Sequence, residues 1–155
     1  MKKWVLCIIA LFSLVSCNKD DNVELNGYSK EEKEVLNILQ GKWRIVNSPY
    51  PEELSFTLFG SRVRKNGKAI AAALDFHGNV VLKYKYLNKD WETWNMYFYV
   101  NTTKREICMY GINEDGTFSI GLTKIYDYEI IDNNMIRLHD KSLSWMNTYK
   151  YKRIE

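Results

Sequence analysis

The feature that most constrains the fold of this chain is a hydrophobic period of two, which recurs in short segments from about residue 70 onward. Apolar and polar residues alternate in these segments, as in a strand with one buried face and one solvated face. The alternation is clearest in residues 80–86 and 91–100, and it recurs in 126–130 and 136–138. Together with residues 42–47 and a closing segment at 143–151, it predicts roughly eight to ten short strands.

Turn-forming residues separate these segments. A turn at His77-Gly78-Asn79 is expected to join strands at 70–76 and 80–86 into a hairpin. The Asp115-Gly116 and Asp132-Asn133-Asn134 sequences are expected to form type I′ turns. Strands with tight turns and no intervening helices favour an antiparallel sandwich or a closed barrel, and closure removes exposed sheet edges. The 11 tyrosines and five tryptophans also suit half-buried strand surfaces.

One helix is expected before the strands. Ser29 and Glu32 have the spacing of a capping box, an apolar stripe runs through residues 35–39, and Gly41 suits a left-handed stop. These signals predict a helix from about Lys30 to Gln40. We expect it to cover one end of an all-β, antiparallel up-and-down barrel.

The first residues form a signal-like segment. Lys2 and Lys3 precede an apolar run from Trp4 to Val15. This run is shorter than the roughly 20 residues that span a bilayer and has the length of a signal-peptide core.

The run ends in Leu14-Val15-Ser16-Cys17, which resembles the lipobox of bacterial lipoproteins. The resemblance implies a signal peptide of residues 1–16, a diacylglyceryl group on Cys17 and a polar tether over residues 17–28. The domain is then residues 29–155. Asn18-Lys19-Asp20-Asp21 resembles an acidic tag for the cell surface, which favours the outer membrane as the location. A plain solvated linker is the alternative interpretation of this tag.

The net charge and the number of cysteines limit the kinds of partner and bond that this chain can form. Without residues 1–16 the basic residues fall from 22 to 20 against 19 acidic residues, which leaves a formal charge of +1. No basic stripe is evident, so no nucleic-acid partner is expected. Cys108 is then the one thiol without lipid, and its apolar neighbours predict a buried strand position.

The order of these elements resembles the lipocalin-like domains of bacterial lipoproteins over residues 29–155. The segments that carry the resemblance are Gly41-Lys42-Trp43, Leu74-Asp75-Phe76-His77-Gly78-Asn79-Val80, Tyr126-Asp127-Tyr128-Glu129-Ile130 and Met135-Ile136-Arg137-Leu138. It implies that Trp43 packs across the closed end of the barrel beneath a late basic residue, for which Arg153 is a candidate.

The same resemblance implies non-covalent binding of a small apolar molecule in the barrel. The residues expected to line the cavity are Tyr84, Tyr86, Trp94, Phe98, Tyr126, Tyr128 and Trp145. A barrel filled by its own side chains is the alternative, and the spacing does not distinguish the two.

An enzyme and an interaction module are the two other classes of function. His77 and His139 stand outside any metal-binding or catalytic motif, so no enzyme, metal or cofactor is expected. Sequence neighbours such as His139 and Asp140 alternate faces on a strand and do not assemble a catalytic triad by adjacency. An interaction module for a glycan or a partner protein is the second alternative, with outward Trp91, Tyr97 and Tyr99 as its patch.

Overall fold

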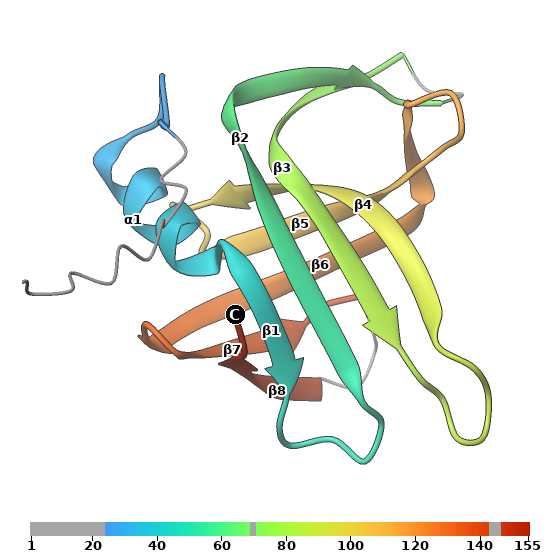
Figure 1. The fold of residues 1–155 in the computed structure, drawn as a ribbon. Coiled ribbons are helices and arrows are strands. Elements are labelled where there is room, and N and C mark those ends of the chain that lie inside the picture. The colour runs from blue at the N-terminus through green and yellow to red at the C-terminus, as the bar shows by residue number, and fades with distance from the viewer. Residues whose placement is uncertain (1–23, 69–70, 143–146) are drawn as a thin grey trace, which may run out of the picture.

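The computed structural model describes residues 24–68, 71–142 and 147–155. One helix precedes eight antiparallel strands, each paired with its neighbours in sequence, and the last strand pairs with the first to close a barrel (Figure 1). The elements are α1 (Lys30–Leu39), β1 (Gly41–Ile45), β2 (Glu52–Asn66), β3 (Ala73–Tyr84), β4 (Glu92–Asn101), β5 (Glu106–Ile112), β6 (Phe118–Asp132), β7 (Met135–Asp140) and β8 (Asn147–Arg153). This architecture confirms the predicted fold class.

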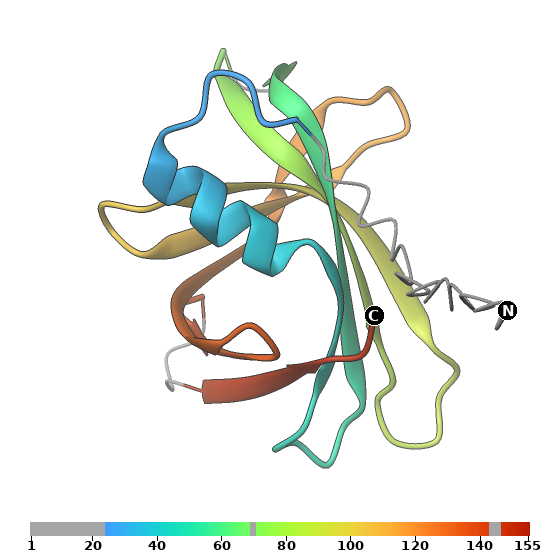
Figure 2. The ribbon, with the colours of Figure 1, turned by 60° about the vertical axis from the view of Figure 1, so that its left-hand side comes forward.

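The helix α1 forms as its capping signals predict. The Ser29 hydroxyl accepts from the Glu32 backbone N–H at 3.1 Å, and the Glu32 carboxylate accepts from the Ser29 backbone N–H at 2.8 Å. Leu36 and Leu39 are buried, and Figure 2 shows α1 lying across one end of the barrel. No helix within the described ranges combines the length and apolarity of a bilayer span.

The predicted hairpin turn at His77-Gly78-Asn79 is wrong, because β3 runs straight through these residues. A Cβ on Gly78 would lie 2.1 Å from the Thr57 carbonyl oxygen and 2.7 Å from a ring carbon of Phe98. The glycine therefore permits a close approach of backbone and ring, not a change of direction. On one side β3 pairs with β4, and on the other with β2, a strand of 15 residues that the sequence pattern missed.

Beyond the barrel wall, β2 and β3 bend away together. Their register shifts between Leu58 and Val63, and the bent ends reach the β5–β6 hairpin, where Gly67 bridges to Phe118 (Figure 1). Phe76 on this extension packs on Tyr97 and Phe118, with ring centroids 5.1 and 5.5 Å apart. The extension thus covers the outer face of β4 and β5.

Two further predictions change in detail. Neither predicted type I′ turn is one, because such a turn needs positive φ at both central residues, and among the described non-glycine residues only Leu87 and Arg105 have it. Gly116 alone has a positive φ of 77° in the β5–β6 turn, and a register shift between Ile130 and Asp132 accompanies the β6–β7 turn. Such irregularities supply the strand twist that a type I′ turn would otherwise match.

The folded domain also begins earlier than residue 29. Leu25 and Tyr28 are only 6% and 7% exposed, and the Asn26 backbone N–H donates to the Gly60 carbonyl at 2.9 Å. Residues 24–28 are therefore packed against β2 instead of forming the end of a polar tether, because these two apolar side chains have a surface to bury against.

Candidate functional site

The barrel end under α1 is sealed by Trp43 and Arg153. Trp43 is fully buried, its indole N–H donates to the Leu39 carbonyl at 2.8 Å, and the Arg153 guanidinium carbon lies 4.5 Å from its ring centroid. Arg153 also donates to the backbone carbonyls of Gln40 at 2.6 Å, Asn133 at 2.9 Å and Ile38. Trp43 and Arg153 thus pack against each other, and this end of the barrel is tightly packed.

Gly41 makes this seal sterically feasible. Its φ is +111°, and a Cβ there would lie 2.5 Å from the Glu155 carbonyl oxygen and 2.8 Å from Nη1 of Arg153. A larger residue would displace the guanidinium from the end of α1. The predicted structural role of Gly41 thus lies at the helix stop and at the contact with β8.

The opposite end of the barrel, where β2, β4 and β8 begin, carries a layer of polar side chains. We call this group the polar layer; its members are Glu52, Tyr84, Glu92, Lys124, Tyr126, Asp140 and Tyr151. Strand register brings three of them into one row, since Glu52 pairs with Tyr84 and Tyr84 pairs with Glu92. The layer is therefore fixed by the sheet itself.

Glu52 is the most unusual member. Its carboxylate accepts a hydrogen bond from the Tyr151 hydroxyl. Burial raises the pKa of Glu52 above its usual value, Asp140 adds to this rise, and Tyr151 and Lys124 oppose it. The next residue, Glu53, faces outward and forms an ion pair with Arg44 at 2.6 Å. Alternation along β2 thus turns Glu52 inward with Leu54, while Glu53 faces solvent.

Asp140 lies deeper in the layer and is 2% exposed. It accepts from the Ser142 backbone N–H at 2.8 Å and lies 3.3 Å from the Lys124 ammonium. Tyr126, also 2% exposed, pairs with Asp140 across β6 and β7. Burial, Glu52 and Asp140 raise the pKa of Tyr126 well above its usual value, so its hydroxyl stays protonated.

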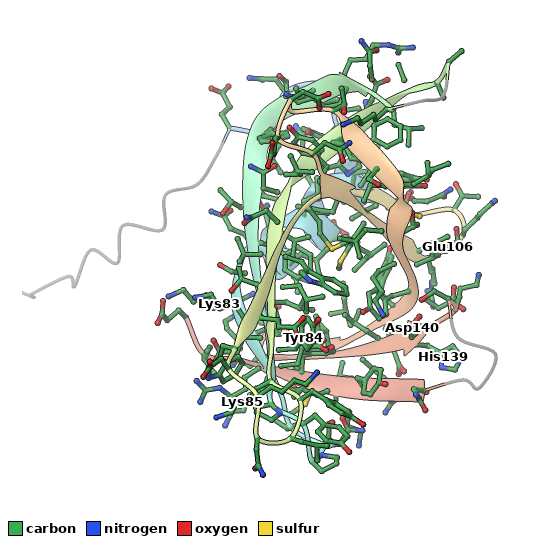
Figure 3. The ribbon with its side chains drawn as sticks, turned by 90° about the vertical axis from the view of Figure 1, so that its right-hand side faces the viewer. Lys83, Tyr84, Lys85, Glu106, His139 and Asp140 are labelled. Atoms are coloured by element: carbon green, nitrogen blue, oxygen red, sulfur yellow. The ribbon has the colours of Figure 1, made fainter. Side chains whose placement is uncertain are left out.

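Aromatic rings from β3 and β4 line the other side of this end. Tyr84 and Trp94 are partly buried and meet edge to face, with ring centroids 5.0 Å apart. The Tyr84 hydroxyl donates to the Glu92 carboxylate, and burial together with that carboxylate raises the pKa of Tyr84 to about 12. Figure 3 shows Tyr84 inside the outline of the barrel, with Lys83 toward its outer side.

The other predicted cavity-lining residues do not lie together. Phe98 and Tyr126 belong to the packed core. Tyr86 lies outside the interior, beyond β3, where it is 49% exposed and stacks on Tyr50 at 4.9 Å. Trp145, like the lipidation candidate Cys17, lies outside the described residues.

Tyr128 lies toward the sealed end, in a groove of about 470 Å³ between α1 and the barrel rim. The groove is lined by Glu31, Glu34, Val35, Thr102, Arg105, Tyr128, Glu129 and Ile130. Tyr128 is thus separated from Tyr84 and Trp94, so the predicted lining residues do not form one site. The sequence showed that these residues alternate, but not at which level of the barrel each one lies.

Neither histidine joins the polar layer. His139 faces outward from β7, with Nδ1 2.7 Å from the Thr148 hydroxyl. His77 is buried near α1, where its Nδ1 accepts from the Val100 backbone N–H at 3.1 Å and burial lowers its pKa to about 4. His77 lies next to Gly78, where the pairing of β3 with β4 ends. Within the described ranges, no three His, Cys, Asp or Glu side chains are grouped as metal ligands.

The outward aromatic residues are also placed differently from expectation. Tyr97 is 6% exposed and Tyr99 is partly buried, because the bent ends of β2 and β3 cover them. Trp91 is 47% exposed, and the β1–β2 and β3–β4 loops add Tyr50, Tyr86 and Leu87. Cys108 is buried as predicted, and burial raises the pKa of its thiol.

Comparison with known proteins identifies no family, so the class of this protein is judged from its fold. No protein-family model matches this sequence, and no curated protein is significantly similar to it. The geometry itself defines a closed, eight-stranded antiparallel barrel that is sealed by a helix at one end and carries a polar layer at the other.

Proposed function

We propose that this chain is a lipid-anchored lipoprotein of the cell envelope whose lipocalin-like barrel binds a small molecule non-covalently. The lipobox-like sequence before Cys17 supports the anchor. Residues 24–28, which pack on the barrel wall beside α1, leave a short connection to Cys17. Several acyl chains on one cysteine would hold the protein stably at a membrane, since each buried methylene contributes about 0.8 kcal/mol.

One observation favours a binding site at the barrel end away from α1. Tyr84 and Trp94 remain partly exposed there beside the buried Asp140. At the α1 end, by contrast, Trp43, Leu36 and Leu39 are at most 1% exposed. Ligand sites combine apolar walls with a few placed polar groups. We therefore expect a small molecule with an apolar body to contact Trp94 and Tyr84.

Native mass spectrometry of the mature lipoprotein in mild detergent, after incubation with envelope extract, tests this binding. We expect a bound small molecule on the wild type that is lost in Trp94→Ala. Trp91→Ala is the matched control, because this tryptophan is exposed on the neighbouring loop. No bound mass on the wild type, or equal retention by both variants, would contradict the proposed site.

The anchor has a separate test. Cys17→Ala should abolish labelling by radioactive palmitate and release the protein from the membrane fraction. Cys7→Ala, which changes the cysteine inside the apolar run, should leave both unchanged. Complete sedimentation of Cys17→Ala with membranes in a carbonate wash would refute lipid anchoring.

A second candidate function is an interaction surface for a glycan or a partner protein. It is favoured by the exposed Tyr50, Tyr86, Leu87 and Trp91, which gather on two neighbouring loops. Flat rings with polar edges suit such contacts. If Trp91→Ala abolishes binding while Trp94→Ala does not, this function replaces small-molecule binding.

A further inference from the structure

We infer that the molecule bound at the polar layer carries a positive charge, as an ammonium group attached to a compact apolar body. The inference rests on the proposed function and names the chemical class of its ligand. Three features of the polar layer support it: its charge balance, an unused hydroxyl and its aromatic wall.

The charge balance of the layer is negative. Glu52, Asp140 and Glu92 contribute three carboxylates, and Lys124 is the one cationic member of the layer as the described residues define it. Lys124 lies against Asp140, which the Ser142 backbone also serves. Asp140 is thus compensated, whereas Glu52 receives a hydrogen bond from Tyr151 alone among the described residues.

A carboxylate that is partly removed from water and lacks a close cation is destabilising, and a cation supplied by a ligand offsets that cost. Lys124 acts on Glu52 through the longer-range field and not through an ion pair. The ammonium of a ligand would complete the compensation that the chain leaves unfinished. A carboxylate ligand would meet like charge from the same groups.

The second feature is Tyr126. Its side chain is 2% exposed, and its hydroxyl lies in the field of Glu52 and Asp140 without donating a hydrogen bond to either. Tyr126 therefore offers the layer a neutral oxygen that accepts a hydrogen bond from an ammonium.

The third feature is the wall formed by Trp94 and Tyr84. The faces of aromatic rings attract cations, and this attraction is strongest for the indole ring. The two rings meet edge to face and remain partly exposed, so they offer both an apolar surface and a π face. Because the barrel core next to the layer is filled by buried side chains such as Phe98, the body of the ligand has to be compact.

The test compares three probes with one phenethyl body: phenethylamine, phenethyl alcohol and phenylpropionate. Isothermal titration of the mature protein near neutral pH should give at least tenfold tighter binding for the amine than for the alcohol, which corresponds to about 1.4 kcal/mol. The carboxylate should bind more weakly than the alcohol. Tryptophan fluorescence follows the same titrations independently.

The variants Glu52→Gln and Glu53→Gln form a matched pair, since these neighbours face opposite sides of β2. Glu52→Gln should reduce amine affinity to that of the alcohol and leave the alcohol unaffected, while Glu53→Gln should change neither. Glutamine still accepts from Tyr151, so the fold is retained, and circular dichroism verifies this.

Equal affinity for amine and alcohol, or equal amine affinity in both variants, overturns the inference and leaves the proposed function standing. Failure of phenethylamine to bind also overturns it, whatever the co-purification experiment shows. If no envelope molecule co-purifies but the amine binds with the expected selectivity, the ligand class stands and the search for the natural ligand has failed instead.

Discussion

Replacing Arg153 with methionine tests how the barrel end under α1 is sealed. Methionine keeps an unbranched apolar chain over Trp43 but removes the charge and every donor of the guanidinium. The variant loses the hydrogen bonds to the Ile38, Gln40 and Asn133 carbonyls and the contact with the Trp43 ring.

The expected loss follows from these contacts. A hydrogen bond to a charged group contributes about 1.5–3 kcal/mol, and a cation–π contact contributes about 0.5–2 kcal/mol. Carbonyls at the end of a helix regain water when they are exposed, so the sum is an upper bound. We expect a net destabilisation of about 3 kcal/mol, which lowers the melting temperature by roughly 10 °C for a chain of this size.

Urea denaturation followed by circular dichroism measures this change. Arg137→Met is the matched control, since Arg137 pairs, among the residues that the structure describes, only with the exposed Glu129 carboxylate. This substitution should cost less than about 0.5 kcal/mol. A double-mutant cycle with Trp43→Leu should give a coupling energy of about 1 kcal/mol. If Arg153→Met costs no more than Arg137→Met, Arg153 does not hold α1 to the barrel.

Three further predictions concern buried groups. Burial raises the folded-state pKa of Glu52, so the ionised carboxyl destabilises the fold as pH rises through that pKa. Glu52→Gln should therefore melt at a higher temperature than the wild type near neutral pH, and thermal melts should show this difference vanishing near pH 4, about the pKa of an unfolded glutamate. Gly78→Ala should lower the free energy of unfolding by about 3 kcal/mol in urea denaturation, because its Cβ would meet the Thr57 carbonyl. Gly121→Ala, whose Cβ has its nearest contact at 3.6 Å, should lower it far less, and similar losses in both variants would refute the close approach at Gly78. Tyr28→Phe should raise stability by about 1 kcal/mol, because the Tyr28 hydroxyl is buried without a hydrogen-bond partner, and a lower melting temperature would show that this hydroxyl does have one.

Much of the fold follows from local patterns in the sequence. The spacing of Ser29 and Glu32 predicted where α1 begins, because a capping box is made between residues three apart. The alternation in residues 91–100 predicted which side chains of β4 face inward, because successive side chains point to opposite faces of a strand. These signals involve residues close together in the sequence, so they can be recognised without the tertiary structure.

The errors lie where a distant segment decides. Gly78 resembled a turn residue because the nearby Thr57 carbonyl and the Phe98 ring belong to other strands. Tyr97 appeared to face solvent because the extension of β2 and β3 that covers it comes from earlier in the chain. Local pattern carries no information about such coverings.

The candidate site shows the same division. The sequence alone determines that apolar and polar residues alternate along the strands and that a helix precedes them. It also supplies Trp43 and Arg153 as residues that can seal an end. Only closure of the barrel decided that Glu52 turns inward beside Tyr151 while Glu53 is paired outside with Arg44, and that Tyr126 pairs with Asp140. The physical reason is that period two defines two faces for each strand, whereas register and closure decide which residues meet within the barrel.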